Sequence, residues 1–214
     1  MYAPVLGDAT FWGFLLQVDR ELAERTRHAG CRSCGAPLHS ACYGRRPRGL
    51  PRGIDPGPEF AVCYSFCCSA DGCRRRHQAP SVRFLGRKVY AAAIVLLLCA
   101  MRQGPTRRTA GELRSLFGVD RRTLCRWRTW WRTVVPGTEF WRRALGLFRA
   151  PVREEDLPQS LIDRFTERGR PRRDVVMATL RFLSGLFGAF GVRRSLMVDS
   201  DPQSLGAAAH GSTP

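Results

Sequence analysis

The sequence predicts a mainly helical protein with one small, cysteine-rich β unit, followed by a three-helix unit and further C-terminal helices. Two observations lead to this fold class. Apolar residues recur at three- and four-residue spacing over most of the chain, as they do along the buried side of helices. Between residues 31 and 78 this period is lost, and seven of the nine cysteines gather there among short strand-like runs.

Glycine and proline interrupt the helical pattern and set the expected ends of each helix. Phe11, Leu15 and Val18 belong to the first helix, and Gly30 ends it. The predicted helices cover residues 8–28, 87–103, 109–117, 120–135, 139–149, 158–168 and 174–188. Residues 44–58 are rich in arginine, proline and glycine without any period, so we expect a mobile loop there.

These elements divide the chain into an N-terminal helix (1–30), the β unit (31–80), a three-helix unit (81–136), a helical C-terminal region (137–198) and a tail (199–214). The tail has low hydrophobicity and is expected to be disordered. The longest apolar run, residues 89–101, is shorter than the roughly 20 residues of a membrane span. No secretory signal is recognised. We expect a cytoplasmic protein without a membrane partner.

Two cysteine pairs indicate a metal site in the β unit. Cys31 and Cys34 are separated by two residues, and Cys68 and Cys73 by four. Four thiolates can surround one Zn²⁺ tetrahedrally and leave it no open position, so the ion would be structural. The strand-like runs 37–43 and 59–66 are expected to form a hairpin with a cysteine pair at its end. The β unit is therefore predicted to be a zinc ribbon.

Neighbouring donors compete for the fourth ligand position. In a strand, Cys68 shares a face with Phe66, and the aromatic face is expected to pack inward, so Cys68 rather than Cys67 is the predicted ligand. Cys67 stays an alternative, together with other nearby donors: His39, Cys42 and His77. Cys99 and Cys125 lie in apolar helical settings and are predicted to be core residues.

The chain is strongly basic. Its formal net charge is +17, and Lys88 is its only lysine. The planar guanidinium of arginine suits phosphate groups and guanine edges, so double-stranded DNA is the leading partner. An acid-free stretch follows the second cysteine pair, and its basic residues are expected to track the phosphate backbone: Arg74, Arg75, Arg76, Arg83, Arg87 and Lys88.

Residues 109–131 carry the pattern of two helices joined by a tight turn. Thr109 and Glu112 form a predicted capping box, Gly118 reverses the chain and Asp120 caps the second helix. The second helix is expected to bury one apolar stripe, made of Leu124, Trp127, Trp131 and Val134. Its arginines then point outward and are the predicted base contacts: Arg121, Arg122 and Arg126.

A cysteine-pair unit that leads into an arginine cluster and then a helix-turn-helix resembles the N-terminal DNA-binding part of bacterial insertion-sequence transposases. It also resembles small zinc-ribbon proteins associated with such elements. The resemblance covers about residues 31–135 and implies a nucleoid-associated protein that binds the end of a transposable element. Arg114 departs from the pattern, because the family usually carries a small residue there.

No catalytic set is recognised. The histidines are scattered and the acidic residues do not converge as a two-metal nuclease requires, so we expect a binding protein and not an enzyme. The alternative is a zinc-stabilised interaction adaptor or transcriptional regulator that docks a transposase or a second copy of itself. In that alternative the docking surface would comprise Phe182, Leu183, Leu186, Phe187 and Phe190, although the sequence favours a core role for these residues.

Overall fold

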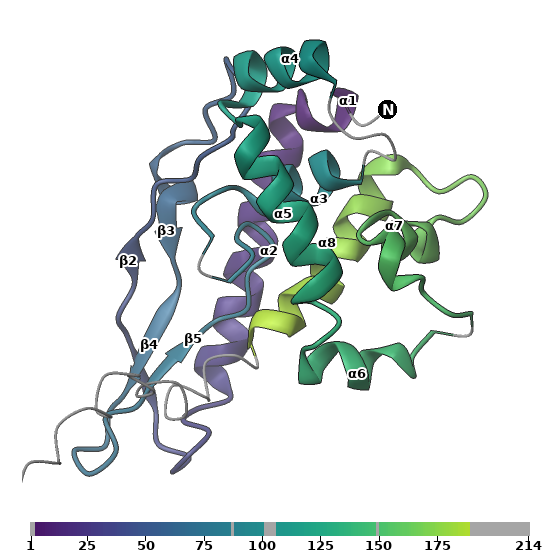
Figure 1. Cartoon of the computed structure of the whole chain (residues 1–214). Coiled ribbons are helices and arrows are strands. Elements are labelled where there is room, and N and C mark those ends of the chain that lie inside the picture. Colours follow the sequence, from purple (N-terminus) through teal and green to yellow (C-terminus); the bar gives the residue numbers. More distant parts are fainter. Residues whose placement is uncertain (1–2, 87, 101–105, 149, 189–214) are drawn as a thin grey trace, which may run out of the picture.

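The computed structural model describes residues 3–86, 88–100, 106–148 and 150–188. The helices are α1 (Ala3–Leu6), α2 (Ala9–His28), α3 (Ala92–Cys99), α4 (Arg107–Phe117), α5 (Arg121–Thr133), α6 (Glu139–Leu145), α7 (Gln159–Phe165) and α8 (Arg172–Gly188). The strands are β1 (Leu38–Ser40), β2 (Tyr43–Gly44), β3 (Val62–Cys63), β4 (Ser65–Cys68) and β5 (Arg76–Gln78). Two 3₁₀ turns are η1 (Pro58–Ala61) and η2 (Glu154–Asp156). A helical body carries a narrow β lobe along one side, which confirms the predicted mainly helical class with a small β unit (Figure 1).

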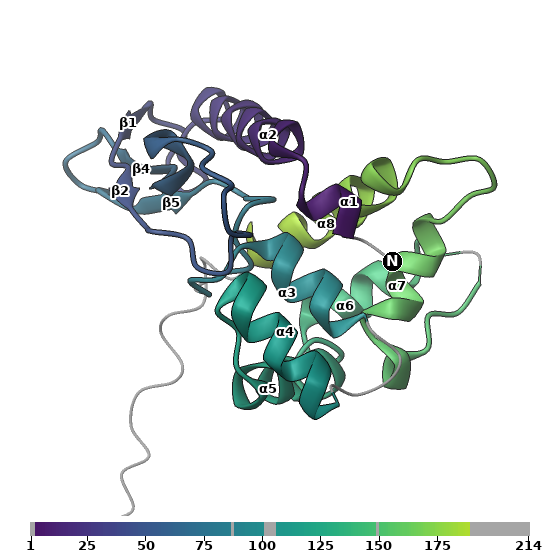
Figure 2. The same cartoon turned by 90° about the horizontal axis from the view of Figure 1, so that it is seen from above.

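Helix α3 lies at the centre of the helical body. All of its residues are buried, because a helix that is apolar on every side must be covered on every side. Figure 2 shows α2 on one side of α3, with α4 and α5 on the other. Trp12 of α2, Trp131 of α5 and Leu180 of α8 are fully buried in the same cluster. One apolar core therefore joins the N-terminal, central and C-terminal helices.

Helix α3 is shorter than the predicted helix over residues 87–103. The residues before it pair with a distant segment, since the Arg48 amide donates to Val89 O at 2.8 Å and the Ala91 amide donates to Arg48 O at 3.0 Å. Residues 87 and 101–103 lie outside the described residues. The segment 44–58, predicted to be a mobile loop, is packed on the body by these bonds and by Leu50 and Ile54.

Helix α4 begins at Arg107, two residues before the predicted start. Thr109 therefore lies inside the helix and not at its cap, so the predicted capping box with Glu112 does not start it. The side chain of Thr109 lies outside the described residues, as do residues 189–214 with the predicted tail. Helix α1 was not predicted, and α6 and α7 end earlier than expected.

Two residues of this alternative docking surface belong to the core, which is the role that the sequence favours for them. Leu183 is fully buried, and the ring of Phe182 packs 5.3 Å from that of Phe140. The side chains of Leu186, Phe187 and Phe190 lie outside the described residues. The described part of α8 therefore packs inward.

The β lobe contains the predicted hairpin. Strand β1 pairs antiparallel with β4, Leu38 opposite Cys68, and β2 pairs with β3. Strand β5, which was not predicted, lies on the other edge of β4. A second, small core lies under this lobe and consists of Ala23, Cys31, Leu38, Phe66, Cys68 and Ala79. So few buried side chains supply little apolar stabilisation, as is usual for units that rely on a bound metal.

Arg83 is buried and cannot track a phosphate backbone, so this part of the sequence prediction is wrong. Its Nε donates to Asp19 Oδ2 of α2 at 2.7 Å, and both side chains are 1% exposed. Its Nη atoms donate to the main-chain oxygens of Phe60 at 2.6 Å and Val62 at 2.7 Å. Arg83 therefore ties α2 to the segment that runs from η1 into β3.

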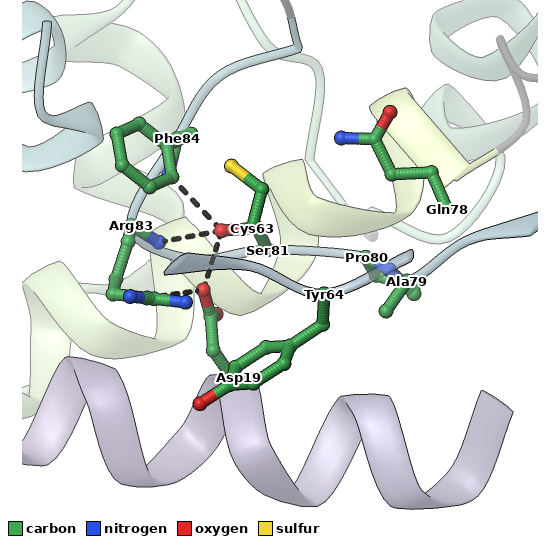
Figure 3. Close-up of a pocket in the computed structure, with 9 residues that line it drawn as sticks. All are labelled: Asp19, Cys63, Tyr64, Gln78, Ala79, Pro80, Ser81, Arg83 and Phe84. Carbon is green, nitrogen blue, oxygen red and sulfur yellow. Dashed lines mark hydrogen bonds and ion pairs between the residues drawn. The ribbon is translucent and has the colours of Figure 1, made fainter. Parts of the chain in front are cut away.

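Asp19 has hydrogen-bond partners for both of its oxygens. Besides Arg83, it accepts from Ser81 Oγ at 2.5 Å and from the Val82 amide at 2.6 Å, and the bond from Ser81 is drawn in Figure 3. The cavity beside this pair measures ≈ 10 Å³, room for about one water. Small-molecule sites occupy roughly 300–1,000 Å³, so this cavity is not such a site.

We expect Arg83→Met to lower the free energy of unfolding by about 3–5 kcal/mol, because it leaves Asp19 buried without its cation. The control is Arg76→Met, an exposed position where a change of no more than about 0.5 kcal/mol is expected. Urea unfolding followed by circular dichroism measures both. Equal unfolding midpoints for the two variants would contradict the structural role of Arg83.

Candidate metal centre and nucleic-acid interface

The four predicted ligands come together at the far end of the β lobe. The sulfurs of Cys31, Cys34, Cys68 and Cys73 all lie within 4.8 Å of one another. Cys31 and Cys73 are 3.6 Å apart, and Cys34 and Cys68 are 3.4 Å apart. A tetrahedron of sulfurs about 2.3 Å from a central zinc has edges of about 3.8 Å. The four cysteines can therefore hold one metal ion.

The first cysteine pair follows α2 directly. Helix α2 ends at His28, and Cys31 begins a tight turn in which the Gly35 amide donates to Cys31 O at 2.8 Å. The amide of Ser33 points at the Cys31 sulfur, 3.5 Å away. Such a turn aims Cys31 and Cys34 at the same point.

The second pair forms a similar turn between β4 and β5. Cys68 ends β4, and the Cys73 amide donates to Ala70 O at 3.0 Å. Arg74 follows Cys73 with a φ of +43°, and Gly35 follows Cys34 with a φ of +75°. In both pairs the residue after the second cysteine thus adopts a left-handed conformation. Arg74 lacks the freedom of glycine there, so its backbone is strained in this turn.

The pKa values of the cysteine thiols at the site are shifted in opposite directions. The Ser33 amide lowers the pKa of Cys31 to about 5, helped by His77, whose Nε2 lies 3.2 Å from the sulfur. Burial raises the pKa of Cys68 to about 12. Metal binding requires thiolates, so a cation would have to stabilise the ionised form of Cys68 in particular.

The alternative ligands lie outside the four-cysteine group. Cys67 contacts Arg74 O at 3.5 Å, and Cys42 contacts Ser65 O at 3.8 Å. His39 is exposed and pairs opposite Cys67. His77 is different, because its contact with Cys31 would let it orient a ligand sulfur. Sequence reasoning missed this role, which depends on the unpredicted strand β5.

Helix α5 has the two sides that the sequence predicts. Gly118 turns the chain with a φ of +63°, and the Asp120 side chain caps α5 by accepting from the Thr123 amide at 2.6 Å. The inner side is buried through Leu124, Trp127 and Trp131. Val134 is 49% exposed, contrary to prediction, and Val135 is buried in its place.

The outer side of α5 is basic and contains no acidic residue. Its exposed residues are Arg121, Arg122, Cys125, Arg126, Thr129, Arg132 and Thr133. Arg126 is held toward the helix by a 3.0 Å bond from Nη2 to Thr123 Oγ1. Cys125 lies on this exposed side, so its predicted place in the core is wrong, whereas Cys99 is buried as expected. Arg114 on α4 is exposed.

Arg74, Arg75 and Arg76, which were predicted to bind phosphate, do not form one surface with α5. Arg74 pairs with Asp71, and Arg75 Nη1 donates to Ser33 Oγ at 3.1 Å. The β4–β5 turn that carries them lies at one end of the molecule, and α5 begins at the other, beside α4 (Figure 1). Lys88, by contrast, lies beside α5: it is half-buried over the ring of Trp130, at 4.1 Å from the ring centre, and burial lowers its pKa. Arg87 lies outside the described residues.

Comparison with protein-family models, with curated proteins and with solved structures found no match to this chain. Among the described residues, no helix has the length and apolar character needed to cross a membrane. The interpretation of the site therefore depends on its geometry and chemistry.

We expect the reduced protein to contain one metal ion per chain, and Cys34→Ser to abolish that stoichiometry, because a ligand sulfur is lost. The matched control is Cys42→Ser, an exposed cysteine outside the group, which should retain the ion. Elemental analysis by mass spectrometry measures the content and separates zinc from iron, which four sulfurs also accept. Equal metal content in the two variants would show that the ligand set is wrong.

Proposed function

We propose that this chain is a DNA-binding protein in which a structural zinc ion, held by the four cysteines, shapes the β lobe. The observation that carries the proposal is the exposed, acid-free arginine side of α5, whose opposite side is fixed in the core by Trp127 and Trp131. A rigid basic helix of this kind fits the major groove of duplex DNA.

The positions of the arginines support base contact. Arg121 and Arg122 stand in the first turn of α5 and Arg126 one turn later, all exposed. In helix-turn-helix proteins the start of the second helix reaches the base edges. Arginine can bond the O6 and N7 atoms of guanine with its two parallel N–H groups. We therefore assign Arg121, Arg122 and Arg126 to base edges.

The zinc ion would have a structural role and would stabilise the fold of the β lobe. Four sulfur ligands leave no position for water or substrate, and the small core of the lobe contains few apolar side chains. Binding of a structural zinc contributes roughly 10–16 kcal/mol in small zinc units, enough to offset that deficit. In this proposal the protein acts by binding and performs no reaction.

The resemblance to the DNA-binding part of insertion-sequence transposases suggests where such a protein would act. The four cysteines, the arginines after Cys73 and the two helices around Gly118 carry that resemblance. The proposed target is accordingly the end of a transposable element. Selection of bound duplexes from a random pool would identify the sequence.

We expect the affinity of the zinc-loaded protein for duplex DNA to fall about 10³–10⁵-fold between about 50 and about 200 mM salt, if about 6–10 phosphates are neutralised. The physical reason is the release of condensed counterions from the duplex. Fluorescence anisotropy with a labelled duplex measures this dependence. An affinity that stays constant over this range would refute binding to the phosphate backbone.

We expect Arg122→Ala to cost about 1–3 kcal/mol of binding free energy on the selected duplex and to relax its sequence preference. Arg25→Ala is the control, since Arg25 is exposed on α2, on the opposite side of the body from α5 (Figure 2). Competition between selected and mixed-sequence duplexes separates base contact from phosphate contact. An equal loss on both duplexes would make Arg122 a phosphate contact, and no binding by the wild type would favour the adaptor alternative.

A further inference from the structure

Three arginines on the segment between β2 and β3 have exposed side chains. This segment, residues 45–53, has the sequence Arg-Arg-Pro-Arg-Gly-Leu-Pro-Arg-Gly and is called the basic loop below. Arg46, Arg48 and Arg52 are exposed, and none of their side chains forms a hydrogen bond or ion pair within the part of the chain that the structure describes. The basic loop contains no acidic residue.

The backbone of the basic loop is fixed even though these side chains are not. Arg45, its first residue, is a structural contact, because its Nη1 donates to Gly86 O at 2.6 Å and its guanidinium lies 5.3 Å from the ring centre of Phe84. Arg48 shares two backbone bonds with Val89 and Ala91. Because the backbone is held, little conformational freedom would be lost when the side chains bind a ligand.

Gly49 shows how closely the basic loop fits the body. It has a φ of +83°, and an added Cβ would lie 3.1 Å from Tyr90 Cδ1 and 3.2 Å from Ile94 Cγ2. Gly53 has a nearly equal φ of +82°, but an added Cβ there would meet no atom within 4 Å. The basic loop therefore packs closely against the body at Gly49 and has free space beside Gly53.

Tyr90, which lies against Gly49 of the basic loop, also contacts α5. The ring of Tyr90 packs edge-on against Trp127 of α5, with 4.7 Å between the ring centres. In Figures 1 and 2 the segment between β2 and β3 rises beside α4 and α5, away from the β4–β5 turn. The basic loop is thus the basic segment beside α5, whereas Arg74, Arg75 and Arg76 lie at the distant end of the lobe.

We infer that the basic loop binds the phosphate backbone of the same duplex whose groove α5 enters, through Arg46, Arg48 and Arg52. This inference depends on the proposed function. Phosphates are the expected ligands because the three arginines are spread along an irregular segment, whereas bases are read in the major groove by a helix or a two-stranded ribbon. Phosphate contacts fix the register of a protein on DNA and carry no sequence information.

The test compares two triple variants with the same change in net charge. Arg46→Ala/Arg48→Ala/Arg52→Ala removes the proposed contacts, and Arg25→Ala/Arg164→Ala/Arg168→Ala removes three exposed arginines elsewhere. The slope of log K against log salt should become shallower by about 0.9 for each lost phosphate contact, hence by about 2.7 in the first variant. The control should keep nearly the wild-type slope.

The outcomes separate this inference from the proposed function. If the wild type binds duplex DNA and both triple variants show the same slope, the basic loop is not a contact, although the protein still binds DNA. If the wild type fails to bind duplex DNA, both ideas are overturned. The first variant should keep the sequence preference of the wild type, and a changed preference would instead assign its arginines to bases.

A second pair of variants tests whether the position of the basic loop matters. Gly49→Ala keeps every arginine but forces a side chain against Tyr90 and Ile94, and Gly53→Ala introduces the same backbone strain in open space. We expect weaker DNA binding by Gly49→Ala than by Gly53→Ala at equal helix content. Equal affinities would show that the close packing at Gly49 has no effect on DNA binding, and would contradict the inference that the body holds the basic loop in place against the duplex.

Discussion

The buried ion pair between Asp19 and Arg83 is the constraint on which the arrangement of the protein depends. It joins the middle of α2 to the strands through the carbonyls of Phe60 and Val62 and to the segment that leads into α3. Burying two charges is costly, and the cost is offset only where nearly every polar atom finds a partner. Here the carboxylate accepts three kinds of donor, and the guanidinium is also flanked by the rings of Phe60, Tyr64 and Phe84. The interaction therefore fixes one orientation of lobe and body.

Local sequence patterns identified those features that depend on residues close together in the chain. The spacing of the cysteine pairs gave the four-sulfur group, and the alternation along β4 correctly favoured Cys68 over Cys67. The turn between α4 and α5 and the start of α5 follow from Gly118 and Asp120, whose turn and cap act within a few residues. These features require no knowledge of distant contacts.

Features set by distant contacts could not be predicted in this way. Arg83 looks like one more residue in a basic stretch, and only the position of Asp19, far away in sequence, makes it a core residue. The late start of α3 within the apolar run depends on Arg48, whose backbone pairs with Val89 and Ala91. Cys125 was expected in the core because apolar residues surround it in the sequence, but the buried stripe of Leu124, Trp127 and Trp131 faces away from it. Charge patterns likewise cannot tell a structural arginine from a free one.

Helix α2 takes part in both apolar clusters, and this has a mechanical consequence. Its first half contributes Phe11, Trp12 and Leu15 to the large cluster, while Ala23 lies in the small one, just before Cys31. A helix of 20 residues is a stiff rod about 30 Å long. An ion bound beside the C-terminal end of α2 would hold that end in place and would oppose fraying of its last turn. The lobe and the body would then be joined by the same stiff helix, so that ordering of the turns around the four sulfurs would restrict the motion of α2 along its whole length.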